Sequence, residues 1–137
     1  MSIIADTSFV FALYNPIDAY HQRAMAFASD VAESVLLPSV ILPELGFLFE
    51  RDLGYAGVVQ FFQQFRYTES HLEPLLNSDL ARVFEIAQQY ANAEFDVVDC
   101  CIMALAERLQ ITKIATFDRR DFHIVRPVHT DYFEIVP

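Results

Sequence analysis

Four carboxylates in this chain lie inside or directly after apolar segments, where a charged side chain needs an explanation. An ionised carboxylate in apolar surroundings is penalised or becomes protonated unless a partner compensates its charge. No set of basic residues that could pair with all four is nearby in the sequence. A bound divalent cation would compensate the four charges together, and ligands that are all oxygen favour Mg²⁺ or Mn²⁺. The four residues are Asp6, Glu44, Asp99 and Asp118.

The chemistry that such a cluster favours is hydrolysis of a phosphodiester bond. Mg²⁺ uses only a few carboxylates, keeps several of its waters and binds substrate phosphate. An ion held in this way activates a water, orients the phosphate and stabilises the leaving oxygen. We therefore interpret the four acids as metal ligands and as catalytic residues at the same time.

Two of the acids follow predicted strands. Asp6 comes directly after the apolar run Ser2–Ala5, and Asp118 comes shortly after the run Lys113–Thr116. In an open α/β sheet, ligands bind beyond the carboxyl ends of the strands. The sequence therefore predicts that these two side chains meet at one edge of a sheet.

The other two acids fall on predicted helices. Glu44 has Ile41 and Leu48 at helical spacing, and Asp99 has Ile102 in the same relation. Because both acids share helix faces with apolar residues, we expect both to be buried and to face the same site as the strand-end acids.

Strands and helices alternate along the chain, which predicts an α/β fold. Short apolar runs bounded by turn signals indicate strands, and apolar residues at helical spacing indicate helices. This order is typical of a three-layer α/β/α domain with a mainly parallel central sheet, and we expect one domain over residues 1–137. Strands are predicted at Ser2–Ala5, Val35–Leu37, His71–Leu76 and Lys113–Thr116, more weakly at Val125–Val128 and Phe133–Val136, and helices at Phe9–Tyr14, from Asp18 to about Ser34, from Ser39 to Gly54, at Tyr55–Phe65, from Ser78 to about Ala91 and at Val97–Leu109.

The charge balance limits how the chain could bind nucleic acid. Nine Lys and Arg against 19 Asp and Glu give a net charge of −10. This argues against a broad basic surface that grips nucleic acid. A nuclease whose metal contacts the phosphate needs only local positive potential, which Arg119, Arg120 and Arg126 provide just after the fourth acid.

Composition indicates a folded globular protein, since 54% of the residues are hydrophobic. The longest apolar stretch, residues 35–49, is interrupted by prolines and a glutamate and is shorter than the roughly 20 residues of a membrane span. Asp6 interrupts the only candidate leader, so we expect a cytoplasmic protein with no membrane segment. The adjacent Cys100 and Cys101 are expected to be reduced helix residues.

Four segments form an ordered pattern over the whole chain. They are Ala5-Asp6-Thr7-Ser8, Leu42-Pro43-Glu44-Leu45, Phe95-Asp96-Val97-Val98-Asp99 leading into residues 102–107, and the run of residues 115–122. The last segment, continued by Arg126-Pro127, is the most specific. In this pattern the chain resembles the PIN domain family and, within it, the VapC-type ribonuclease toxins of VapBC modules.

The resemblance implies roles for residues in these segments. Metal-site acids would be Asp6, Glu44, Asp99 and Asp118, polar supports Thr7, Ser8 and Thr116, second-tier acids Asp96 and Asp121, and residues that contact RNA Arg119 and Arg120. The family further implies divalent-metal-dependent cleavage of RNA, a homodimer, and a VapB-like antitoxin that blocks the site. The RNA target, the number of metals and the antitoxin are not specified by the sequence.

Structural roles compete with these assignments. Asp6 is also a suitable cap for the following helix, and Asp99 a first-turn acid favoured by the helix dipole. Hydroxyls such as Thr7, Ser8 and Thr116 are often turn or cap residues. The aromatic residues of two consecutive predicted helices are typical of a core, although their density would also suit a groove for a partner helix: Phe47, Phe49, Tyr55, Phe61, Phe62 and Phe65.

Two other functions compete with the nuclease. A haloacid-dehalogenase-like phosphatase also has an Asp after its first strand, but it needs a second Asp where this chain has Ser8. It also needs a Lys near the later acids, whereas Lys113 precedes Asp118. A non-catalytic PIN-like scaffold for metal or protein binding is the second alternative, and the intact set of acids argues against it.

Overall fold

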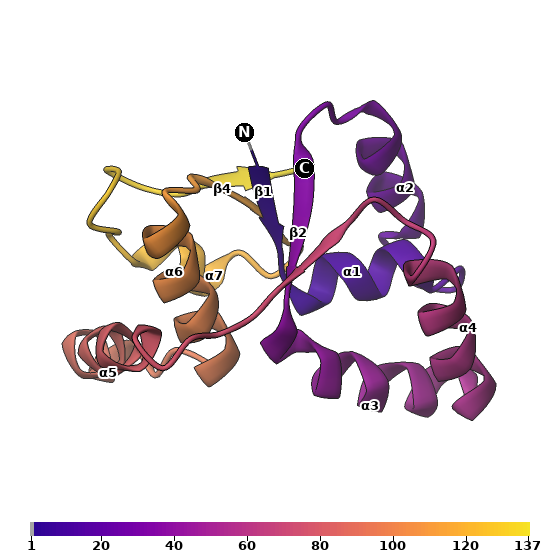
Figure 1. The fold of residues 1–137 in the computed structure, drawn as a ribbon, viewed down its shortest axis with the longest axis horizontal. Helices are drawn as coiled ribbons and strands as arrows, with labels where there is room; N and C mark the ends of the chain where they lie inside the picture. The colour runs from indigo at the N-terminus through magenta and orange to yellow at the C-terminus, as the bar shows by residue number, and fades with distance from the viewer. Residues whose placement is uncertain (1) are drawn as a thin grey trace.

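A parallel sheet of five strands forms the centre of the computed structural model, which describes residues 2–137 (Figure 1). The strand order is β3-β2-β1-β4-β5, and every neighbouring pair is parallel. Because β1 lies between β2 and β4, the strand order reverses beside β1. The strands are β1 Ser2–Ala5, β2 Ser34–Pro38, β3 His71–Glu73, β4 Lys113–Ala115 and β5 Glu134–Val136.

Seven α-helices within residues 2–137 cover the sheet. Figure 1 shows α1 to α4 on one side of β1 and β2 and α5 to α7 on the other, which confirms the predicted three-layer α/β/α fold. The helices are α1 Thr7–Tyr14, α2 His21–Asp30, α3 Leu42–Leu53, α4 Tyr55–Phe65, α5 Asp79–Gln89, α6 Val97–Leu109 and α7 Arg120–Ile124, with short 3-10 turns at Ser39–Ile41 and Ala91–Ala93.

Helix α6 is the central helix of the core. Every residue from Cys100 to Glu107 is buried, as expected for a helix that is apolar almost all round. Both cysteines are free residues of this helix, as the sequence predicted, and both are buried. The burial of α6 fixes the position of its first turn, which carries Asp99.

The tight connection from β1 to α1 places the first acid. Asp6 accepts a hydrogen bond from the backbone N–H of Phe9 at 3.0 Å and so caps α1. Its own N–H donates to the carbonyl of Ala115 at 3.0 Å, which extends the pairing with β4. The end of β1 and the end of β4 are thereby joined at one edge of the sheet.

The segment after β4 differs from the prediction. Residues Val125–Val128 are not a strand, and α7, which precedes them, was not predicted. The Arg126 guanidinium donates to the carbonyls of His123 and Val125 at 2.8 and 3.1 Å, and Pro127 has no N–H to offer a neighbouring strand. Five residues of helix are too few to give a periodic signal in sequence.

Three predicted boundaries were also wrong. Asp18 does not cap a long helix: its carboxylate accepts from the N–H of Tyr20 at 2.8 Å in a turn, and α2 runs only from His21 to Asp30. The strand predicted to Leu76 stops at Glu73, since Pro74 cannot donate to a ladder.

Among the helices of residues 2–137, none has the length and apolar character needed to cross a bilayer.

Candidate active site

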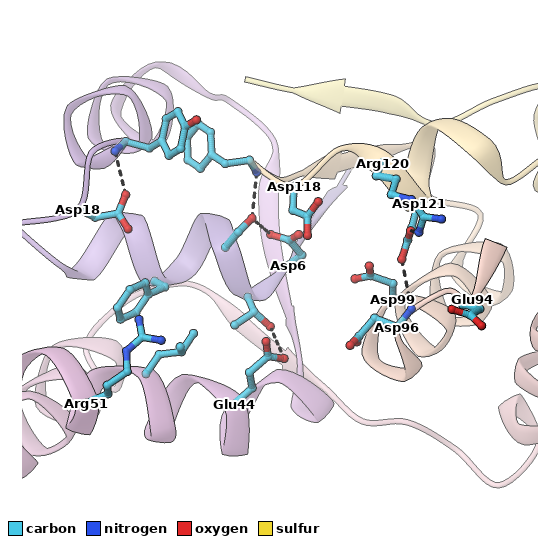
Figure 2. Close-up of a pocket in the computed structure, with 16 residues that line it drawn as sticks. Asp6, Asp18, Glu44, Arg51, Glu94, Asp96, Asp99, Asp118, Arg120 and Asp121 are labelled. Atoms are coloured by element: carbon cyan, nitrogen blue, oxygen red, sulfur yellow. Dashed lines mark hydrogen bonds and ion pairs between the residues drawn. The ribbon is translucent and has the colours of Figure 1, made fainter.

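A cavity of about 590 Å³ opens at the edge of the sheet where β1 and β4 end. All four predicted acids line it, although they come from the connection between β1 and α1, from α3, from α6 and from the loop after β4. In Figure 2, Asp6 and Asp118 lie next to each other, between Glu44 and the group formed by Asp96, Asp99 and Asp121. The structure therefore brings the predicted acids to one cavity, which is also lined by Thr7, Ser8, Asp96, Arg120 and Asp121.

Asp6 is the buried member of the cluster, with 4% of its surface exposed. Besides capping α1, its carboxylate accepts hydrogen bonds from Ser8 Oγ at 2.8 Å and from Thr116 Oγ1. Burial raises the pKa of Asp6 to about 6, even though the hydrogen bonds from Thr116, Phe9 and Ser8 oppose the rise. Asp6 is thus fixed in place while its negative charge is only partly compensated.

Thr116 connects Asp6 to Asp118. Its hydroxyl Oγ1, which contacts Asp6, also lies 2.9 Å from both the backbone N–H and the carbonyl oxygen of Asp118. Ser8 completes the link, because its Oγ accepts from the N–H of Phe117 at 2.9 Å. These contacts fix the backbone that carries Asp118 to the end of β1.

Asp99 lies in a group of acids on the opposite wall. Burial raises the pKa of Asp99 to about 9, and a hydrogen bond with Asp121 together with the charges of Asp6 and Asp96 adds to the rise. Asp121 accepts from the N–H of Asp96 at 3.2 Å and pairs with Arg120 at 2.6 Å. The Asp121 side chain therefore ties the start of α7 to the start of α6.

The burial expected for Glu44 was wrong. Glu44 is exposed, and so is Asp118, whereas Asp99 is half-buried. Glu44 stands in the first turn of α3, where the helix dipole favours a negative charge. Its carboxylate accepts a hydrogen bond from Thr7 Oγ1 at 3.2 Å, which places it at the rim of the cavity.

The four acids predicted as metal ligands have no basic partners within residues 2–137. Arg51 and Arg120 line the cavity, but each pairs with a carboxylate beside it in sequence, at 2.7 and 2.6 Å. In the same residue range, no three His, Cys, Asp or Glu side chains are close enough to hold an ion directly.

A family comparison agrees with this arrangement. The profile of the PIN domain family matches residues 3–126, which is most of the chain and includes all four acids. The chain belongs to the PIN domain family.

Known proteins similar to this PIN domain include VapC toxins. Ribonuclease VapC26 of Mycobacterium tuberculosis is 21% identical over 135 residues, which are 98% of this chain and 100% of that protein. The crystal structure of VapC20 from the same species, a toxin that cleaves the sarcin-ricin loop, has a TM-score of 0.81 at 24% identity and covers 93% of this chain and 98% of its own. The VapBC2 complex of Rickettsia felis, bound to a promoter DNA fragment, gives 0.73 at 14% identity with full coverage of both chains.

Sequence reasoning missed several residues of the PIN domain cavity. Asp18, Tyr20, Arg51 and Glu94 also line it. Asp18 and Tyr20 belong to the loop before α2, which no sequence signal connects to the other acids. Arg119, predicted beside Arg120 as a residue that contacts RNA, lies outside this cavity and donates to the carbonyl oxygen of Pro137 at 2.7 Å.

Proposed function

We propose that this PIN domain is a divalent-metal-dependent endoribonuclease of the VapC type. The observation that carries the proposal is a cavity whose lining includes the four predicted carboxylates, none of which has a Lys or Arg partner within residues 2–137. Similarity to a ribonuclease over nearly the whole chain supports RNA as the substrate. Since the proposed substrate is cellular RNA, we propose the cytoplasm as its location.

The donor set fits a hard cation. Carboxylate oxygens are the ligands that Mg²⁺ and Mn²⁺ prefer, and the raised pKa values of Asp6 and Asp99 are the response of acids that lack a compensating charge. We assign Asp6, Asp99 and Asp118 as the residues that would hold the ion, with Glu44 at the rim. Because no three acids of residues 2–137 are within direct binding distance of one ion, part of the coordination would pass through waters, which Mg²⁺ retains.

The protein contributes preorganisation to the proposed reaction. When bound, the ion would supply Lewis acidity that activates a water for attack on the phosphorus. Asp6 needs no rearrangement, because Ser8 and Thr116 already hold its carboxylate. The exposed Asp118 and Glu44 carboxylates would turn toward the ion, because like charges keep them away from the phosphate.

The decisive experiment compares RNA cleavage by the wild type and by Asp6→Asn, with and without Mg²⁺ or Mn²⁺. Asn retains the capping oxygen but not the charge, so the fold should persist while metal-dependent cleavage falls. Loss of an outer-shell partner typically costs 10- to 100-fold, so loss of a ligand should cost about 100-fold or more. Asp131→Asn, which removes an exposed acid outside the cavity, is the matched control and should cleave like the wild type.

Two outcomes would contradict the nuclease. Equal cleavage by the wild type and Asp6→Asn would show that the activity comes from another protein. A wild type that binds metal by calorimetry but cleaves no RNA would favour the non-catalytic scaffold.

We also propose that a VapB-like antitoxin covers the outer face of α3 and α4 and that the chain forms a homodimer. Phe47 and Phe62 are large apolar side chains on these helices that remain 65% and 46% exposed. Exposed apolar side chains that gather on neighbouring elements favour a protein partner. Complexes of VapB and VapC among the similar structures support this choice of partner.

The partner proposal predicts that Phe62→Glu weakens capture of a co-expressed antitoxin by about 30-fold or more, since loss of an interface hot-spot residue costs about 2 kcal/mol or more. Cleavage of RNA by the free protein should be unchanged, because Phe62 does not line the acidic cavity. Light scattering on the purified chain measures the dimer. Equal capture of the wild type and Phe62→Glu would assign the antitoxin to another face.

A further inference from the structure

Three aromatic rings form a stack that ends at the acidic cavity. Phe9 in the core stacks on Phe117, with ring centroids 5.9 Å apart and planes inclined by 23°. Phe117 in turn stacks on Tyr20, with centroids 4.5 Å apart and planes inclined by 7°. Phe117 directly precedes Asp118, and both Phe117 and Tyr20 line the cavity. The stack therefore connects the core to the wall of the proposed active site.

Tyr20 is the exposed end of this stack. Its side chain is 44% exposed, and one ring face is covered by Phe117, so the exposed surface belongs to the outer face and edge. Of the large apolar side chains that are exposed within residues 2–137, Tyr20 is the one that lines the acidic cavity. An exposed ring held parallel to a partner offers a flat surface of the size of a nucleobase.

The loop before α2 holds Tyr20 in this position. The Asp18 carboxylate accepts from the N–H of Tyr20 at 2.8 Å, and the carbonyl of Asp18 accepts from the N–H of His21 at 3.1 Å. Asn15, which is buried, accepts from the N–H of Ile17 at 3.2 Å. Because the loop is fixed by its own hydrogen bonds, the ring is placed before any ligand arrives.

Arg23 lies beside the stack, and Arg119 contacts the same main-chain oxygen as Arg23. The Arg23 guanidinium is 5.4 Å from the Phe117 ring centroid and 6.0 Å from that of Tyr20. Arg23 and Arg119 both donate to the carbonyl oxygen of Pro137, at 3.5 and 2.7 Å. Within residues 2–137 neither forms an ion pair with an Asp or Glu. In a protein with net charge −10, this is a place where two guanidinium groups lie close together.

We propose that Tyr20 is a stacking platform for one unpaired nucleobase of the RNA substrate, with Arg23 and Arg119 contacting the two phosphates that flank this nucleotide. The proposal rests on the proposed ribonuclease function, because it places a nucleotide next to the phosphate that is cleaved. Stacking tolerates any base, so the platform requires a single-stranded nucleotide and selects no sequence. Substrate choice would then depend on which nucleotides of a folded RNA can be splayed out.

The test measures binding of short single-stranded RNAs that carry 2-aminopurine at successive positions, whose fluorescence is quenched by stacking. It uses the Asp6→Asn background in Mg²⁺, which keeps the RNA intact. Tyr20→Ala should abolish quenching at one position and raise Kd by about 5- to 150-fold, the range that loss of one stacked base gives. Tyr20→Phe keeps the ring and should bind and quench like the parent. Tyr67→Ala removes a 75% exposed tyrosine that does not line the cavity, so it should change neither the quenching nor Kd.

The outcomes separate the platform from the nuclease. If Tyr20→Ala binds and quenches as Tyr67→Ala does while the wild type cleaves RNA, the platform is wrong and the nuclease stands. If quenching depends on Tyr20 but the wild type cleaves nothing, the RNA site stands and the nuclease falls. Absence of any RNA binding overturns both. A thermal unfolding midpoint of Tyr20→Ala close to that of the parent protein establishes that any loss of RNA binding is not caused by unfolding.

Discussion

Asp6 and Asp99 are two acids of one cavity that lie in different surroundings. Asp6 is held by hydrogen-bond donors on three sides, so burial raises its pKa only to about 6. Asp99 faces the Asp121 carboxylate instead, and its pKa is raised to about 9. In the absence of a cation, the pair formed by Asp99 and Asp121 therefore keeps a proton at neutral pH. Binding of a cation would have to release that proton, which couples metal affinity to pH.

The raised pKa of Asp99 predicts a pH dependence of stability. Between its ordinary value of 3.8 and about 9, the folded protein binds a proton that the unfolded chain has released. The free energy of unfolding of the metal-free protein should therefore fall as pH rises through this window. Asp99→Asn removes this contribution and should give a shallower fall, which urea unfolding in the presence of a chelator at several pH values measures. A slope equal to that of the wild type would contradict the assignment. Mg²⁺ should offset the fall in the free energy of unfolding of the wild type, because a bound cation stabilises the ionised form of Asp99.

Helix α5 is fastened to α6 by a buried ion pair. Arg82 donates to Glu107 through Nε at 2.6 Å and through Nη2 at 3.0 Å. The Glu107 side chain is 5% exposed, whereas that of Arg82 is 23% exposed. Since α6 also carries Asp99 in its first turn, the ion pair between Arg82 and Glu107 helps to fix the position of Asp99 in the cavity.

The two partners of this pair should not be equivalent in mutants. Arg82→Ala leaves a buried carboxylate without its cation and should lower the free energy of unfolding by about 3 kcal/mol. Glu107→Ala leaves an arginine that can reach water, so the cost should be about 1–2 kcal/mol. Chemical denaturation of both single mutants and the double mutant measures this difference and the coupling. Equal costs would indicate that Glu107 is hydrated in solution.

Elements with long periodic patterns could be predicted from sequence, and those fixed by local contacts could not. The strand-end position of Asp6 and Asp118 follows from apolar runs and the rule for parallel sheets, and the structure has them at one edge. The exposure of Glu44 could not be predicted, because apolar neighbours at helical spacing do not show whether the residue between them faces the core or the solvent. The loop that carries Tyr20 lines the cavity because of tertiary contacts, and such contacts leave no periodic signal in the sequence. The extent of the domain, residues 1–137, stays a prediction.

The whole molecule carries few positive charges that are free to bind RNA. Of its nine Lys and Arg, five form ion pairs with Asp or Glu in the part of the chain that the structure describes, residues 2–137. The others include Arg23 and Arg119 beside the aromatic stack. Attraction of RNA would therefore be local rather than spread over the surface, and the remaining acidic surface repels nucleic acid that approaches elsewhere.

This charge distribution predicts a weak salt dependence of RNA binding. With two phosphate contacts on single-stranded RNA, the slope of log K against log salt should be about −1.4. Arg119→Gln should reduce its magnitude by about 0.7. Titrations over a range of KCl concentrations at fixed Mg²⁺ measure both slopes. A wild-type slope several times steeper would mean that a basic surface formed by dimerisation contributes.

The two buried thiols of α6 allow local opening of this helix to be measured directly. Cys100 follows Asp99 in sequence, is 2% exposed, and burial raises its pKa to about 11. An alkylating reagent can reach it only during excursions in which α6 separates from its neighbours. The rate of modification therefore measures how often α6 separates from its neighbours, and the native chain reports this opening without an introduced label.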